Sequence, residues 1–354
     1  MTPSSLPKCA EPASLEEALC RAGLLDGGSV TGVSTEASYA TVLSHIFRLR
    51  PAYTDTVRDA PRTLILKAGL ADRPGGPWAG GKHEVAFYRD VAPSMPSGIV
   101  PRCFAAHWDN ETGTWHLLLE DLSDSHFVAT RWPVPPEFAQ CEAIVRTRAR
   151  CQAAFWDDPR LGVGIGSWQD AHAHEEATRA MVAHFSRFAD EMGDRLSAER
   201  RSLYERMFDS APRLAQRYLS RRNMTIIQGD AHIWNCFLPK DGARDGGRLF
   251  DWDAWQVNTG SDDLACMMAQ QWYPDLRRRF ESRLLDCFHD ELVARGVRSY
   301  DRRALQDDYR LSALWLIATP IWQHANGIPP VIWWNNFERV CMAVDDLDCR
   351  ELMA

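Results

Sequence analysis

The stretch IIQGDAHIWNCFLP, residues 226–239, places polar side chains between two apolar runs. The apolar residues at its two ends are typical of buried strands. Asp230, His232 and Asn235 lie in the turn between them, which Gly229 marks. Polar groups in such a position are costly unless they have partners. The turn is therefore either a hydrogen-bonded network or a functional site.

The composition describes an ordinary globular protein. The chain has 354 residues, which is long for one compact core, with 45% hydrophobic and 25% charged residues. Its net charge of -8 argues against a nucleic-acid or anionic-membrane binder, because such proteins need a basic face. We find no apolar signal segment, no bilayer-spanning run and no CxxC spacing among the cysteines. We therefore expect a cytoplasmic protein with reduced thiols. The sequence carries no signal for its oligomeric state.

The chain changes character along its length. Short apolar runs with alternating patterns predict mostly strands in the first part, with one or two helices. One of those helices follows a capping-box pattern at Ser14 and Glu17, and another, around residues 80–92, stops at Pro93. From about residue 137 onward, length and periodicity predict mainly helices. These patterns predict an α+β protein.

Three charged residues outside the turn add to its candidate functional groups. Lys67, one of four lysines, lies in the predicted strand RTLILKAG, residues 62–69, and Glu84 lies on the next predicted helix. Asp251 ends the apolar run in LFDWD, and Asn235 follows Asp230 by five positions, as in the catalytic loop of protein kinases. A Lys with a Glu partner, a base Asp and a metal-binding Asn and Asp are what phosphoryl transfer requires.

With these motifs the chain resembles the aminoglycoside phosphotransferase family, which shares the protein-kinase-like fold with choline and ecdysteroid kinases. QGDAHIWN stands where that family has H-G-D-x-x-x-x-N, and FDW is followed by DLA at Asp263–Ala265, twelve positions after Asp251. The resemblance implies a bilobal α+β fold. A small antiparallel-sheet lobe, residues 1–121, would bind nucleotide, and a larger, mainly helical lobe, residues 122–354, would carry catalysis and the acceptor.

The resemblance also implies an activity and its site residues. The protein would be an ATP-dependent O-phosphotransferase that moves the γ-phosphoryl group of ATP (or GTP) to a hydroxyl of a small molecule. Asp230 would be the catalytic base, and Asn235 and Asp251 would hold Mg²⁺. Lys67 would contact the phosphates, with Glu84 as its ion-pair partner.

Other nucleotide contacts are implied in the first lobe. The backbone near Glu120 and Leu122, in LLLEDL, would bind adenine. The segment GVSTEASYA, residues 32–40, would form the loop over the phosphates, with the hydroxyl of Ser34 and its neighbours cradling them.

Two departures from the family keep alternatives open. Gln228 and Gln152 stand where related sequences have His, so a catalytically impaired, nucleotide-binding pseudokinase is one alternative. An aminoglycoside-type antibiotic kinase is another. A protein kinase is a weaker one, since no A-P-E-like segment follows FDWD. Residues 264–354 are nearly balanced in charge and rich in aromatic residues, which favours a moderately apolar hydroxylated acceptor over a polycationic aminoglycoside.

Overall fold

The computed structural model describes residues 7–25, 27–41, 44–54, 60–70, 80–243 and 245–354. The chain divides into two compact units. The first unit contains Met1–Phe127 and Pro239–Ala254, and the second contains Val128–Leu238 and Trp255–Ala354. In the described residues, no helix is both long and apolar enough to cross a bilayer.

The first unit is built on a five-stranded antiparallel sheet with the order β1-β2-β3-β5-β4. The strands are β1 (Val30–Ala40), β2 (Ser44–Tyr53), β3 (Leu64–Gly69), β4 (Cys103–Trp108) and β5 (Trp115–Glu120). Because β3 lies between β2 and β5, its side chains are shielded along both edges. Lys67 is opposite Ile46 on one side and Leu117 on the other.

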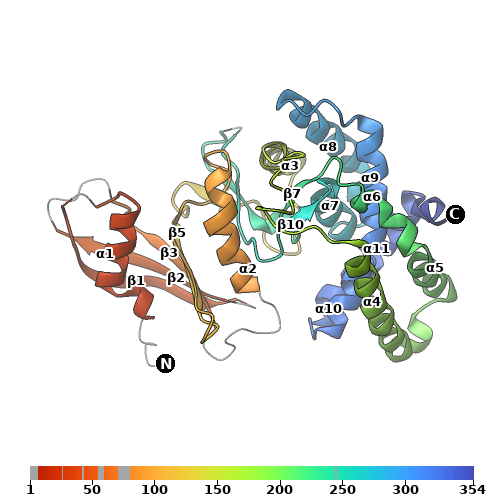
Figure 1. The fold of residues 1–354 in the computed structure, drawn as a ribbon, viewed down its shortest axis with the longest axis horizontal. Helices are drawn as coiled ribbons and strands as arrows, with labels where there is room; N and C mark the ends of the chain where they lie inside the picture. The colour runs from red at the N-terminus through yellow and green to blue at the C-terminus, as the bar shows by residue number, and fades with distance from the viewer. Residues whose placement is uncertain (1–6, 26, 42–43, 55–59, 71–79, 244) are drawn as a thin grey trace. The chain divides into compact units, whose positions relative to one another are not determined.

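Helices cover both faces of this sheet (Figure 1). Helix α1 (Pro12–Arg21) packs its buried residues, such as Leu15 and Leu19, against a cluster that includes Leu64 and Leu66 of β3. Because successive side chains of a strand point to opposite faces, Lys67 lies on the other face. There α2 (Gly80–Ala86) contacts β4 and β5. It continues as a wider helical turn, Phe87–Val91, and ends in the turn Ala92–Ser94, as the proline predicts.

The predicted capping box of the first helix is wrong. Helix α1 begins at Pro12, and its N-cap residue, Glu11, makes no side-chain cap. The hydroxyl of Ser14 instead donates to the carbonyl of Lys8, at 3.0 Å. A proline is favoured at the first helical position because it lacks the N–H that would need a partner there. That preference sets the start of the helix here.

The second unit is mainly helical. Its strands β7 (Thr225–Ile227) and β10 (Gln256–Asn258) form a short antiparallel ribbon. Figure 1 shows the helices of this unit gathered beside that ribbon. The helices are α3 (Phe138–Ala153), α4 (Ala171–Met192), α5 (Ala198–Leu214), α6 (Gln216–Leu219), α7 (Ser261–Ala265), α8 (Pro274–Ala294), α9 (Arg302–Trp315), α10 (Ala318–Ala325) and α11 (Pro330–Asp346). The described part of the chain has three further short strands, β6 (His126–Val128), β8 (Cys236–Pro239) and β9 (Arg248–Leu249), of which β9 belongs to the first unit. The expected α+β fold, with strands first and helices after, is confirmed.

Candidate active site

An ammonium group held by two carboxylates forms the polar centre of the first unit. The Nζ atom of Lys67 lies 2.7 Å from Oε2 of Glu84 and 2.6 Å from Oδ1 of Asp251. The side chain of Glu84 is buried, whereas that of Asp251 is 38% exposed. Burial alone would lower the pKa of Lys67, but the two carboxylates outweigh it and raise that pKa above its usual value. Lys67 is therefore a cation at neutral pH.

The Asp251 turn is fastened to the helix that carries Glu84. Asp251 has a positive φ of 64°, which Asp tolerates better than most residues. The next residue, Trp252, donates its backbone N–H to Oε1 of Glu84 at 3.4 Å. Its buried ring stacks on Phe87, with centroids 4.0 Å apart and planes 8° from parallel. This packing fixes the carboxylate of Asp251 at the end of Lys67.

The turn with Asp230 forms the corresponding polar centre of the second unit. The chain leaves β7, reverses at Gly229 with a φ of 82°, and then makes one 3₁₀ turn, Ile233–Asn235. The side-chain amide of Asn235 donates to the backbone carbonyl of Asp230 at 2.9 Å. The Asp230 side chain is 49% exposed, and its Oδ2 lies 3.5 Å from Nε2 of His232. The turn thus presents a carboxylate on a backbone that Asn235 holds in place.

A buried carboxylate, Asp263, supports this turn from below. Its oxygens accept the backbone N–H groups of Gln228 and Gly229 and the side-chain amide of Gln152, each at 3.0 Å. Both glutamines at the family's histidine positions are therefore buried and hydrogen-bonded. They take part in holding the turn.

Arg148 completes the support, and sequence reasoning missed it. Its fully buried guanidinium donates at 2.7 Å to Oε1 of Gln228 and at 2.7 Å to the carbonyl of Ala231, and lies 3.5 Å from Asp263. The available signal was its position on α3, one helical turn before Gln152, which puts both side chains on the same face. A buried Arg beside a buried Asp needs this many partners to offset the loss of water.

The predicted nucleotide contacts lie in the first unit. Residues 32–40 were predicted to form a loop, but the structure has them in β1. The exposed Ser34 hydroxyl donates to the backbone carbonyl of Arg50 at 3.4 Å. The loop prediction failed because Ser and Thr fit an exposed edge strand as well as a turn. The carboxylate of Glu120, on β5, accepts the N–H of Arg102 at 3.1 Å. The carbonyl of Leu122 accepts the N–H groups of Ser125 and His126 at 3.1 and 2.8 Å.

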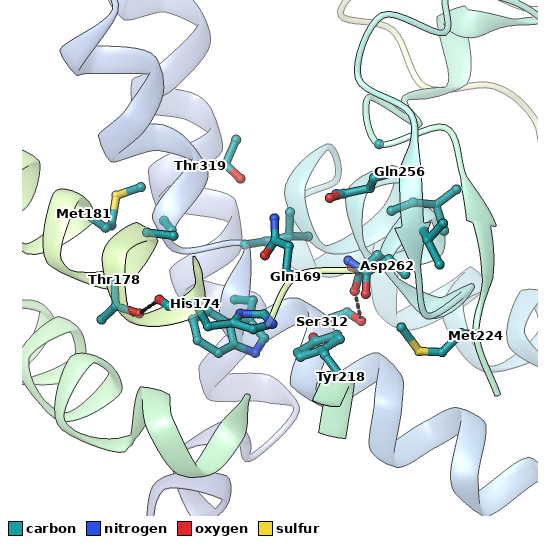
Figure 2. Close-up of a pocket in the computed structure, with 18 of the residues that line it drawn as sticks. Gln169, His174, Thr178, Met181, Tyr218, Met224, Gln256, Asp262, Ser312 and Thr319 are labelled. Carbon is teal, nitrogen blue, oxygen red and sulfur yellow. Dashed lines mark hydrogen bonds between the residues drawn. The ribbon is translucent and has the colours of Figure 1, made fainter. Parts of the chain in front are cut away.

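A cavity of about 350 Å³ lies in the second unit and reaches Gly229, the residue before Asp230 (Figure 2). Its wall is largely apolar and aromatic, with side chains that include Trp168, Met181, Phe208, Tyr218, Met224 and Trp315. The stretch HAHEEA, residues 172–177, predicts a solvated helix start, and most of it is exposed at the start of α4. His174 is the exception that bears on the cavity, because it is half-buried in this wall. Burial lowers its pKa, so His174 is neutral at neutral pH.

A strand lysine paired with a glutamate of the next helix, followed by a helical unit with an Asp-x-x-x-x-Asn turn, defines a protein-kinase-like protein. The model of the ecdysteroid kinase-like family matches residues 40–298, and the chain belongs to this family. This family of small-molecule kinases is among the relatives that the sequence predicted, and that prediction is confirmed.

Solved structures agree with the fold. A Ralstonia eutropha protein assigned to the aminoglycoside phosphotransferases is similar with a TM-score of 0.58 and 12% identity, over 96% of this chain and 98% of that one. Choline kinase from Cryptosporidium parvum is similar with a TM-score of 0.56 and 9% identity, over 90% and 91%. Amicoumacin kinase in complex with AMP-PNP, Ca²⁺ and Ami gives 0.51 and 13%, over 93% and 92%. At such identities the likeness establishes the fold alone. No curated protein sequence matches the chain.

Proposed function

We propose that this protein is an ATP-dependent O-phosphotransferase that moves the γ-phosphoryl group to a hydroxyl of a small molecule. The observation that supports this most is the ammonium of Lys67 between Glu84 and Asp251, at 2.7 and 2.6 Å. A purely structural ion pair needs one carboxylate. The second one, on a half-exposed turn, suits a site that receives a metal–phosphate group.

Each unit contributes its own part of the chemistry. Lys67 would bind phosphate oxygens, and the ion pair with Glu84 would hold the ammonium group of Lys67 in position. Asp230 would accept the proton of the attacking hydroxyl, and its half-exposed carboxylate suits that role. The buried network of Asp263 and Arg148 fixes the turn before substrate arrives, so little reorganisation is needed during the reaction.

The oxygen atoms at the two predicted metal ligands fit Mg²⁺, which prefers carboxylate and amide oxygens. Asn235 uses its amide N–H₂ on the carbonyl of Asp230, at 2.9 Å. Among the described residues no donor binds its Oδ1, which is therefore the atom left for a metal. When bound, Mg²⁺ would neutralise charge on the phosphates of ATP. Asn235 and Asp251 would hold it there.

The lining of the cavity next to Asp230 supports the proposal that the acceptor has a moderately apolar body. Aromatic rings and methionine side chains supply most of its wall. Ligand pockets commonly combine such walls with a few polar groups that fix orientation. This lining favours an apolar hydroxylated compound over an aminoglycoside, whose several ammonium groups would each need a partner.

A phosphorylation screen tests the proposed function. Small-molecule alcohols, including kanamycin-type and neomycin-type compounds, are incubated with the protein, Mg²⁺ and γ-labelled ATP, and in parallel with GTP. We expect labelled product from at least one apolar alcohol. Nucleotide binding without transfer to any alcohol would instead support a pseudokinase.

The Gln228→His variant is expected to remain active, within about tenfold of wild type or about 1.4 kcal/mol of barrier. Gln228 accepts from Arg148 at 2.7 Å and donates to the carbonyl of Asn235 at 3.3 Å. A neutral imidazole also offers one acceptor and one donor. The measurement is kcat on the acceptor found in the screen. Complete loss of activity in a folded variant would mean that Gln228 has a role of its own.

A further inference from the structure

One carboxylate borders the acceptor cavity without a charged partner. Asp262, on α7, is the only Asp, Glu, Lys or Arg among the described residues that line the cavity. Its Oδ1 accepts hydrogen bonds from the hydroxyls of Ser312 and, at 3.4 Å, of Thr259. No described residue donates to its Oδ2 or forms an ion pair with it. Figure 2 shows Asp262 at the cavity with its bond to Ser312 dashed.

The surroundings of Asp262 disfavour its negative charge. Burial raises its pKa to about 7, the hydroxyls of Ser312 and Thr259 oppose this, and the nearby Asp263 and Asp308 add to it. Asp308 is itself paired with Arg217 at 2.6 Å, so that cation is already engaged. Removing a carboxylate from water without a cation nearby is energetically costly. A positive charge from a ligand would offset that cost.

The aromatic wall of the cavity favours the same kind of ligand. The ring of Tyr218 lies 6.3 Å from that of Trp315, edge to face, and stacks on His174 at 6.0 Å. The faces of such rings attract ammonium groups, most strongly where water is excluded. His174 is neutral, as its lowered pKa indicates, so it adds no positive charge that would repel a cation.

We propose that Asp262 determines acceptor specificity by binding, through Oδ2, the single ammonium group of a hydroxylated acceptor with an apolar body. This inference rests on the proposed function, since that function makes the cavity an acceptor pocket. Only one carboxylate lines the cavity among the described residues, so a second ammonium would be buried without a partner. The pocket thus selects for one positive charge and against several.

Calorimetric titration with a matched pair of alcohols tests this proposal. Phenylalaninol and 3-phenylpropan-1-ol share a body and a hydroxyl, and only the first carries an amine. At pH 8 we expect phenylalaninol to bind about tenfold or more tightly than the neutral alcohol, as for a charge-assisted hydrogen bond. In Asp262→Asn that preference should disappear. Asp307→Asn is the matched control, because it makes the same substitution at an exposed position of α9. In this variant the preference should persist.

A second measurement avoids substitution. Lowering the pH of the wild-type titration from 8 to 5.5 should protonate Asp262 and remove the preference for the amine, while the neutral alcohol binds as before. Other titratable or charged groups near Asp262 are Asp263, Asp308, Arg217, Tyr218, Tyr300 and His174. The Asp262→Asn titration over the same pH range separates their effects from that of Asp262.

Three outcomes would overturn the proposal: equal binding of the two alcohols, an unchanged preference in Asp262→Asn, or no binding of phenylalaninol at millimolar concentration. Thermal unfolding of Asp262→Asn shows whether the variant is folded. Because these are binding measurements, they can succeed even where the phosphorylation screen yields no product. Failure of the proposed function and failure of this inference are therefore distinguishable.

Discussion

Replacing Asp230 by Asn is expected to lower the rate of phosphoryl transfer by about a thousandfold or more, because an amide cannot accept the proton of the acceptor hydroxyl. Nucleotide affinity should change little, since the carboxylate acts on the acceptor. The backbone carbonyl that binds Asn235 at 2.9 Å is retained, so the turn should keep its shape. The measurements are single-turnover transfer to the acceptor found in the screen and a titration with Mg·ATP.

Asp194→Asn provides the matched control, because Asp194 is an exposed aspartate of the same unit and lies outside the turn. It should have wild-type rates. Circular dichroism and thermal unfolding show whether each variant is folded. Near-wild-type transfer by folded Asp230→Asn would exclude Asp230 as the base and with it the proposed reading of the turn.

The turn could be found from sequence because its chemistry is local. Asp230 and Asn235 lie five positions apart between apolar strands. This spacing can be recognised without knowing which other segments pack against the turn. Lys67 was found because a lysine within an apolar strand needs a partner. Its contacts with Glu84 and Asp251, at 2.7 and 2.6 Å, link three segments of the first unit that the sequence could relate only through the family's pattern.

Features that depend on packing were less predictable. The cavity draws its wall from segments as distant as Trp168, Tyr218 and Trp315, and no periodicity relates them. His174 follows a capped helix start, which predicts exposure, yet tertiary packing half-buries it. Local propensity cannot separate these outcomes, because burial of a helix start depends on which other helices contact it.

Residues 32–40 were difficult to predict for a different reason, because their residue types fit two kinds of local structure. Their Ser and Thr residues are common both in turns and on exposed strand edges, and the pairing of β1 with β2 decided in favour of a strand. Strand β1 ends at Ala40 and β2 begins at Ser44, and residues 42 and 43 lie outside the described part of the chain. The proposed contact of Ser34 with phosphate therefore concerns a strand hydroxyl.

Replacing Asp251 by Ala is expected to affect nucleotide binding as well as rate. The change removes a carboxylate oxygen from the proposed Mg²⁺ site, and Lys67 keeps Glu84 as a partner at 2.7 Å. We expect transfer to fall by about a thousandfold, or about 4 kcal/mol of barrier. Affinity for Mg·ATP should fall by about tenfold. Affinity for ATP in the presence of a chelator should not fall, because that complex has no metal for Asp251 to bind.

Asp253→Ala is the informative companion variant, because it removes a carboxylate two residues further along the same turn. If Asp251 is the ligand, loss of the Mg²⁺-dependent part of the affinity should be confined to Asp251→Ala. Titrating Mg²⁺ at fixed ATP for both variants measures that part directly. Equal Mg·ATP affinity in Asp251→Ala and wild type would remove Asp251 from the metal site. It would then leave the carboxylate a purely electrostatic role, as the second ion-pair partner of Lys67.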